Sequence, residues 1–121
     1  MKVAGFGEIL LRLSTKKGIL ISNANEFNIN YGGGEANVLI SLSRFGIKTR
    51  AITKVSNDSI GDAIIRYLNE NSVDTSFVTR GSKRTPIYFL EAGSGNRSSK
   101  VIYDRKDSNF SSITEEDINI E

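Results

Sequence analysis

The order of the predicted elements indicates an α/β fold with a mainly parallel sheet flanked by helices. An apolar run opens the chain, and apolar residues recur at helical spacing after the glycines at 32–34. A second strand pattern and a second helical stripe follow, which gives the order strand, helix, strand, helix. This order is typical of parallel strands joined by crossover helices. The last third instead predicts two strands, around a turn at 93–99.

The strand predictions rest on apolar runs and on alternation. Residues 2–7 form a short apolar run punctuated by glycines, which is typical of a buried strand. Leu11 and Leu13 alternate with polar neighbours, and 27–31 ("FNINY") alternates in the same way. The segment 48–55 ("KTRAITKV") is a further strand.

Two helices are predicted from apolar residues that recur every three or four positions. Val38, Leu42 and Phe45 share such spacing, and Gly46 is placed to end the first helix. Cap-forming residues at 56–58 precede the second helix. Its apolar stripe consists of Ile60, Ala63, Ile64, Tyr67 and Leu68.

Composition excludes several classes of function. The 121 residues suit one domain, 25% are charged, and the net charge of +2, without any long basic run, gives no reason to expect nucleic acid as a partner. Cysteine and histidine are absent, which excludes disulfides, thiolate nucleophiles and histidine bases. Neither a signal peptide nor an apolar run of ~20 residues is present, so the sequence predicts a cytoplasmic protein without membrane contact.

The glycine stretch "NYGGGEAN" at 30–37 is the strongest candidate site. Neither the dinucleotide fingerprint nor the P-loop fits, because Leu10 stands where the third fingerprint glycine belongs and Glu35 stands where the P-loop lysine belongs. A glycine loop at a helix N-terminus remains, which suits hydroxyls, carboxylates or phosphates. Asn37 adds a donor and an acceptor, as a polyol requires. A tight turn with a capping residue is the alternative.

A second candidate group lies in the last third of the chain. Tyr103 and Arg105 are two residues apart and share one face of a strand, and Tyr88 lies near them if the two strands pair. Arginine offers a planar fork for a carboxylate, and tyrosine offers a hydroxyl beside a ring that can cover a sugar. Glu8 ends the first strand, where α/β sheets bind ligands. A solvated strand face and a solvent-facing glutamate are the alternatives.

The segment "GGGEANVLISLSRFG" resembles the N-terminal signature of the ribokinase-like (PfkB) carbohydrate kinases, a glycine pair followed by asparagine and an amphipathic helix. Gly32 and Gly33 match the pair, and Asn37 matches the asparagine. "KVSNDSIGD" resembles the segment that follows in this family, with Ser56 in place of a glycine. The resemblance covers 1–121 and implies a small β-sheet lid from residues near 9–14, 27–31 and 86–105.

Three segments are most similar to the 2-keto-3-deoxygluconate kinase branch: "GEILLRLS", "TPIYFLE" and "VIYDRKDSNFSSI". This branch holds its sugar acid with the glycine loop, a tyrosine that matches Tyr88, and a Tyr-x-Arg that matches Tyr103 and Arg105. The resemblance therefore implies the substrate-side residues Gly33, Asn37, Tyr88, Tyr103 and Arg105. Gly32, from the matching glycine pair, and Glu8, from its place at the end of the first strand, complete the candidate substrate-binding set. Fructokinase and other sugar kinases of the family share most of the signature and remain alternatives.

The family's second signature, which carries the catalytic aspartate and the anion hole, does not occur in this sequence. We therefore expect the N-terminal, substrate-binding portion of a sugar kinase, without its ATP-binding half and inactive alone. The complete enzyme would use ATP and Mg²⁺, and neither is expected on this chain alone. A homo-oligomer through the lid strands is expected, because exposed strand edges invite pairing. A non-catalytic sugar-binding or dimerisation module is the alternative.

Overall fold

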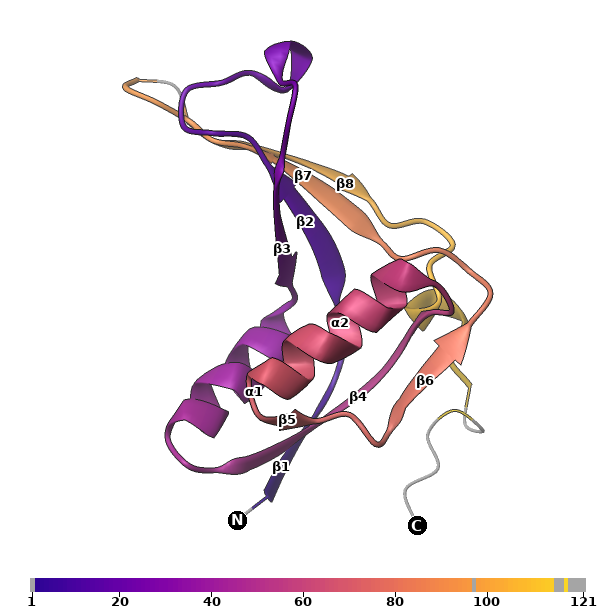
Figure 1. Ribbon diagram of the computed structural model, residues 1–121. Coiled ribbons are helices and arrows are strands. Elements are labelled where there is room, and N and C mark those ends of the chain that lie inside the picture. Colours follow the sequence, from indigo (N-terminus) through magenta and orange to yellow (C-terminus); the bar gives the residue numbers. More distant parts are fainter. Residues whose placement is uncertain (1, 97, 115–116, 118–121) are drawn as a thin grey trace.

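The computed structural model describes residues 2–96, 98–114 and 117. Within these residues the chain forms two four-stranded sheets (Figure 1). The core sheet contains β1 (Lys2–Phe6), β4 (Lys48–Ser56), β5 (Val73–Asp74) and β6 (Val78–Gly81). The second sheet contains β2 (Leu10–Ser14), β3 (Asn28–Gly32), β7 (Ile87–Glu91) and β8 (Lys100–Asp104). The predicted fold class, a mainly parallel sheet with helices and a smaller sheet, is confirmed.

Every strand pair of the core sheet is parallel. β1 pairs with β4 so that Lys2 lies opposite Lys48, and β4 also pairs with β5 and β6. β6 was not predicted, because its four residues "VTRG" carry neither an apolar run nor an alternation. It nevertheless extends the parallel sheet beside the C-terminal half of β4.

Two helices cover one face of the core sheet. α1 (Gly34–Arg44) packs on β1, β4 and β5, while α2 (Ser59–Glu70) packs on β4 and β5 (Figure 1). Val38 and Phe45 of the predicted first helix point away from this core, with 56% and 83% of their surface exposed. No described helix is long and apolar enough to cross a membrane. The buried core consists of Ile9, Ala36, Leu39, Ile40, Ala51, Val55, Ile64, Leu68 and Val73.

The N-terminus of α2 is capped as the sequence predicts. The Asp58 carboxylate accepts hydrogen bonds from the backbone N–H groups of Ile60 and Gly61, at 3.0 and 3.1 Å. It also accepts the Ser56 hydroxyl at 2.7 Å, and Ser56 in turn contacts the Thr85 hydroxyl at 2.5 Å. Serine at position 56 therefore ties the end of β4 to the segment that enters β7.

The second sheet has the order β3-β2-β7-β8. β2 runs antiparallel to β3 but parallel to β7, and β7 and β8 form an antiparallel pair. A short 3-10 helix, η1 (Ile21–Asn23), lies between β2 and β3, and another, η2 (Phe110–Ser112), follows β8. The sheet projects away from the core sheet in Figure 1.

Two rows of side chains cross the second sheet on opposite faces, because neighbouring residues of a strand point to opposite sides. One row is polar and the other is apolar. The polar row contains Asn30, Arg12, Tyr88 and Tyr103, and the apolar row contains Ile29, Leu13, Phe89 and Ile102.

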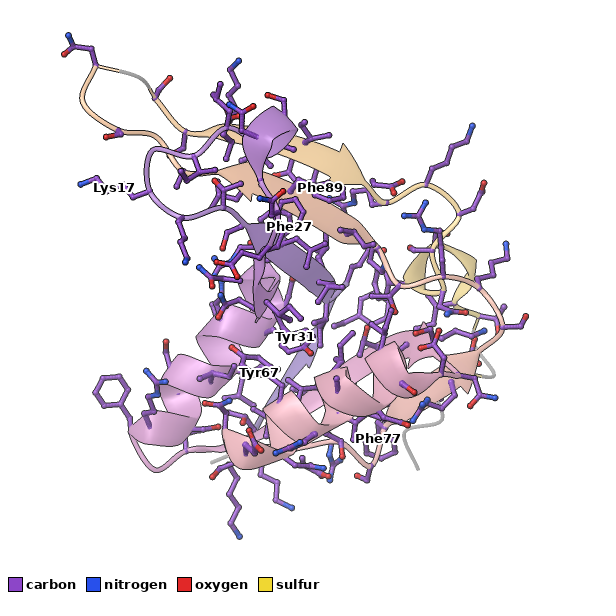
Figure 2. The ribbon with its side chains drawn as sticks, turned by 45° about the horizontal axis from the view of Figure 1, so that its top comes forward. Lys17, Phe27, Tyr31, Tyr67, Phe77 and Phe89 are labelled. Atoms are coloured by element: carbon purple, nitrogen blue, oxygen red, sulfur yellow. The ribbon has the colours of Figure 1, made fainter. Side chains whose placement is uncertain are left out.

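Two aromatic pairs stabilise the second sheet (Figure 2). Tyr31 of β3 contacts Tyr67 of α2, with ring centroids 5.1 Å apart. Phe27 packs on Phe89 with its centroid at 5.8 Å. The first pair joins the second sheet to the helical layer of the core.

Candidate functional site

A pocket of about 390 Å³ lies where the chain crosses between the two sheets. Its walls come from the end of β1, the start of β2, the glycine loop before α1, and the segment after β8. Residues far apart in sequence therefore meet there. The lining residues are Phe6, Gly7, Glu8, Leu10, Gly33, Gly34, Glu35, Arg105 and Phe110.

The conformation and surroundings of Gly33 explain why the loop needs glycine at this position. It is the N-cap of α1 and has a φ of +151°, which side chains rarely adopt. A Cβ at this position would also lie 2.5 Å from the carbonyl oxygen of Glu8. Both the backbone angle and the close approach exclude a side chain, so this loop lies directly against the strand crossover that carries Glu8.

Glu8 is mostly buried and fully engaged. Only 9% of its side chain is exposed, and one carboxylate oxygen pairs with Nη2 of Arg105 at 2.6 Å. The other oxygen accepts the hydroxyl of Ser108 at 2.5 Å. The alternative of a solvent-facing glutamate is therefore wrong.

Tyr88, Tyr103 and Arg105 contact one another in succession. Tyr88 and Tyr103 lie opposite each other in the β7–β8 pair, with ring centroids 5.9 Å apart. The guanidinium of Arg105 lies 5.9 Å from the Tyr103 ring. A Cβ on Gly32 would lie 2.9 Å from the Tyr88 hydroxyl, so the tyrosine closes over the glycine loop.

Asn37 is separate from this group. Its backbone N–H donates to the Gly33 carbonyl at 3.0 Å, as in an ordinary first helical turn, and its side chain is exposed. It does not line the pocket. Of the seven predicted residues, only Glu8, Gly33 and Arg105 line the pocket. Gly32, Tyr88 and Tyr103 adjoin them through the contacts described above, whereas Asn37 meets Gly33 through its backbone. The role of all seven in binding sugar stays a prediction.

Sequence reasoning missed three polar residues near the pocket. Glu35 lines it, Ser108 supports Glu8, and Arg12 stands beside Tyr88 in the polar row, with no hydrogen-bond partner for its Nε among the described residues. Alternation along the strand predicts that Arg12 points to the opposite side from Leu11 and Leu13. Only the pairing of β2 with β3 and β7 decides that this side is the polar face with Tyr88. Ser108 lies 100 residues from Glu8 in sequence, so no local signal joins them.

The segment that returns from β8 to the core is bonded to the segment between β6 and β7. Arg84 forms two parallel contacts with the Asp104 carboxylate, at 2.7 and 2.6 Å. This guanidinium lowers the pKa of Asp104, and the same carboxylate raises the pKa of Arg84. The Asn109 side chain bonds both backbone groups of Lys83, its amide oxygen accepting the N–H at 3.0 Å. These contacts hold the crossover at residues 105–109 in place.

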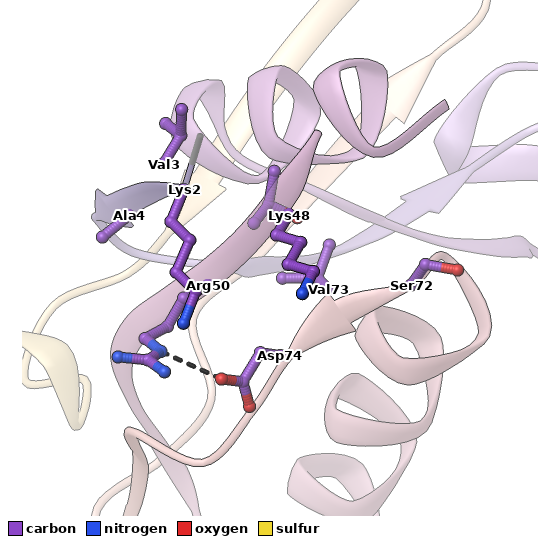
Figure 3. A pocket seen from close by; sticks show the side chains of 9 residues that line it. Lys2, Val3, Ala4, Lys48, Arg50, Ser72, Val73 and Asp74 are labelled. Atoms are coloured by element: carbon purple, nitrogen blue, oxygen red, sulfur yellow. Dashed lines mark hydrogen bonds and ion pairs between the residues drawn. The ribbon is translucent and has the colours of Figure 1, made fainter. Parts of the chain in front are cut away.

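A second hollow of about 390 Å³ lies at the opposite end of the core sheet (Figure 3). Its wall includes Lys2, Lys48 and the ion pair between Arg50 and Asp74, at 2.9 Å. The pKa of Asp74 is lowered, first by the backbone N–H of Ser76 and then by Arg50. No predicted site residue lines this hollow.

Within the described ranges, no three His, Cys, Asp or Glu side chains come together in a way that could hold a metal ion.

The family model described as pfkB family carbohydrate kinase matches residues 2–120. The chain belongs to this family. The ribokinase-like resemblance read from the glycine loop is therefore confirmed, and the activity of the family is phosphorylation of carbohydrates.

Three relatives are informative. A 2-dehydro-3-deoxygluconokinase structure from Thermotoga maritima is 44% identical, with a TM-score of 0.93, over 97% of this chain and 36% of that chain. The sugar kinase PH1459 of Pyrococcus horikoshii is 33% identical over 97% of this chain and 37% of its own length. Its structure in complex with ATP superposes with a TM-score of 0.85, over 97% of this chain and 38% of that chain. A 2-dehydro-3-deoxygalactonokinase of Haloferax volcanii is 30% identical over 84% of this chain and 32% of its own length.

The chain thus spans about a third of the length of the relatives it matches.

Proposed function

We propose that this chain is the substrate-binding and lid portion of an ATP-dependent kinase that phosphorylates a hydroxyl of 2-keto-3-deoxygluconate. One observation carries the proposal: Arg105 stands at a pocket whose other wall is the glycine loop at the start of α1. An acid end and a polyol end can thus be bound in one place, because a guanidinium suits carboxylates and helix N–H groups suit hydroxyls.

Each residue has a distinct proposed part. Gly32 and Gly33 let the substrate approach the backbone, while Tyr88 and Tyr103 cover it with their rings. Arg105 receives the carboxylate. Asn37 binds a hydroxyl beside the first turn of α1, although it does not line the pocket in this chain. The two oxygens of Glu8 already have protein partners, Arg105 and Ser108.

The substrate class is supported by the names of relatives. 2-Dehydro-3-deoxygluconate is another name for 2-keto-3-deoxygluconate, and the kinase named for it in Thermotoga maritima is 44% identical to this chain. The Haloferax volcanii relative is named for the corresponding galactonate. Both names denote 2-keto-3-deoxy sugar acids.

The remaining features concern the complete enzyme. It would take ATP, as the relative solved with ATP does, and Mg²⁺ would neutralise phosphate charge. The second sheet would serve as a lid that excludes water from the pocket. Its outer strands, β3 and β8, would join two subunits into a homo-oligomer. The cytoplasm, where ATP is available, is the proposed location.

Two alternatives differ in measurable ways. Another sugar kinase of the family, such as a fructokinase, would prefer a neutral sugar and would gain nothing from Arg105. A non-catalytic sugar-binding or dimerisation module would bind a sugar without transferring phosphate.

The test is a phosphoryl-transfer assay on the complete polypeptide that carries this sequence, with ATP, Mg²⁺ and either 2-keto-3-deoxygluconate or fructose. We expect the sugar acid to have the higher kcat/KM. Arg105→Ala should lower kcat/KM for the sugar acid by about 10- to 150-fold, the effect of losing a hydrogen bond between charged groups, and should change little for fructose. A preference for fructose favours the fructokinase alternative, and an absence of turnover with tight sugar binding favours the binding module.

A further inference from the structure

The strongest unexplained feature near the pocket is the chain of contacts Ser108–Glu8–Arg105. Ser108 is fully buried, with 0% of its surface exposed, and its hydroxyl donates to one oxygen of Glu8 at 2.5 Å. The second oxygen of Glu8 pairs with Arg105 at 2.6 Å. Each oxygen of the carboxylate therefore has its own partner, one on each side.

Ser108 is itself held firmly. The backbone N–H of the next residue, Asn109, donates to the carbonyl of Arg84 at 3.2 Å. The hydroxyl of Ser111 donates to the Ser108 carbonyl at 2.6 Å. The serine thus provides a fixed donor, and the direction of the Glu8 carboxylate follows from it.

The two charged partners differ in exposure. Glu8 is 9% exposed, whereas Arg105 is 52% exposed. A carboxylate so far removed from water is costly unless its charge is paired and hydrogen-bonded. The guanidinium has five N–H donors, and its contact with Glu8 is made through Nη2. Donors therefore remain for a ligand in the pocket that Arg105 lines.

We propose that Glu8 and Ser108 are positioning residues for Arg105. Ser108 orients the Glu8 carboxylate, and Glu8 holds the guanidinium at the pocket with its remaining donors free for the carboxylate of the substrate. Less rotational freedom is then lost when the substrate binds, because the arginine is ordered beforehand. This inference rests on the proposed function, since it requires an acidic substrate at Arg105.

A different role for Glu8 makes a different prediction. If Glu8 accepted a sugar hydroxyl directly, replacing it would weaken the binding of acidic and neutral sugars alike. If it acts through Arg105, only the sugar acid is affected, and the effect disappears once Arg105 has been removed. A double-mutant cycle separates the two roles.

The experiment uses the complete kinase with 2-keto-3-deoxygluconate and with its neutral analogue, in which CH₂OH replaces the carboxylate. Steady-state KM and kcat are measured for wild type, Glu8→Gln, Ser108→Ala, Arg105→Ala and the Glu8→Gln/Arg105→Ala double variant. Glu8→Gln should raise KM for the sugar acid about tenfold, as expected for one hydrogen bond to a charged group. The kcat of Glu8→Gln with the sugar acid should stay within about twofold of wild type. The KM of this variant for the neutral analogue should also stay within about twofold of wild type.

Ser108→Ala should raise the same KM by about threefold, since it disturbs only the orientation of Glu8. In the double variant, KM should equal that of Arg105→Ala alone. Glu70→Gln is the matched control, because it removes a carboxylate from an exposed ion pair with Arg66 far from the pocket. Thermal unfolding of every variant checks that it is folded, and Ser108→Ala carries the test if Glu8→Gln does not fold.

Equal losses for the acid and the neutral analogue would overturn the inference, and so would additive losses in the double variant. Wild-type enzyme that phosphorylates the neutral analogue but not the acid would overturn the proposed function, and the positioning role with it. A selective, non-additive loss supports both.

Discussion

At the scale of single residues, the glycines at 33 and 34 should behave differently although they are neighbours. Gly33 has a φ of +151° and faces the Glu8 carbonyl, whereas a Cβ on Gly34 would meet no atom within 4 Å. Gly33→Ala should therefore lower the free energy of unfolding by about 1–3 kcal/mol, the cost of a strained backbone residue. Gly34→Ala should leave it unchanged or raise it slightly, because alanine favours helix. Urea unfolding of both variants measures the difference.

Equal unfolding midpoints for the two alanine variants would show that the loop relaxes around the added methyl group. The close approach of Gly33 to Glu8 would then have no energetic importance, and neither the backbone angle nor this contact would require glycine at position 33.

The predictability of the site differs from residue to residue. The meeting of Tyr88 with Tyr103 followed from the sequence once the two strands pair, since alternation alone decides their common face. The partners of Glu8 did not, because Arg105 and Ser108 reach it only when the chain crosses between the two sheets for the fourth time. Contacts at such sequence separation depend on the whole fold rather than on local pattern.

At the scale of elements, the start of α2 depends on Asp58. The hydrogen bond from the Ser56 hydroxyl is the main cause that lowers the pKa of this carboxyl in the folded protein, and the hydrogen bond from the Gly61 N–H is the second. Its capping is therefore complete above the unfolded-state pKa of about 3.9 and is lost as the pH falls through the lower folded-state pKa. Asp58→Ala should lower the free energy of unfolding by about 1 kcal/mol at pH 7. The difference from wild type should shrink as the pH falls below about 4.

Asp58→Asn is the matched control for the charge. Asparagine also caps helices, so this variant should lose less than the alanine variant, and its stability relative to alanine should not depend on pH. Urea unfolding at several pH values distinguishes these outcomes. A wild-type advantage over Asp58→Ala that persists undiminished far below pH 4 would mean that the carboxylate charge has no part in the cap.

Both helices could be predicted from the sequence, because apolar spacing and caps are local signals. The arrangement of the second sheet could not, since β2 pairs with β7 in parallel across more than 70 residues of chain. The exposed Val38 shows a further limit of local pattern. α1 carries apolar residues on more than one face, and only packing decides that Ala36, Leu39 and Ile40 meet the core sheet.

At the scale of the whole molecule, the second sheet exposes an apolar row on one face. Ile29 of β3 and Ile102 of β8 are 61% and 53% exposed at its two ends. Leu13 and Phe89 complete the row between them. Leu13 and Phe89 are half-buried, so the exposed apolar surface lies at the two ends of the row, and exposed apolar surface of this kind marks interaction surfaces. The two ends support the proposed homo-oligomer, in which the outer strands join two subunits, because Ile29 and Ile102 stand on these outer strands, β3 and β8.

A charge placed in this row should separate the subunits. Ile102→Glu removes the burial of an isoleucine, about 1.5–3 kcal/mol for each copy, and adds the cost of desolvating a carboxylate. Sedimentation of the complete kinase over a range of concentrations should show a dimer for wild type and a monomer for Ile102→Glu. Phe45→Glu is the matched control, because Phe45 is 83% exposed but lies at the end of α1, outside the second sheet. It should remain a dimer. If Phe45→Glu dissociates while Ile102→Glu does not, the subunits meet through the helical layer instead, and the second sheet is free to cover the pocket without a partner.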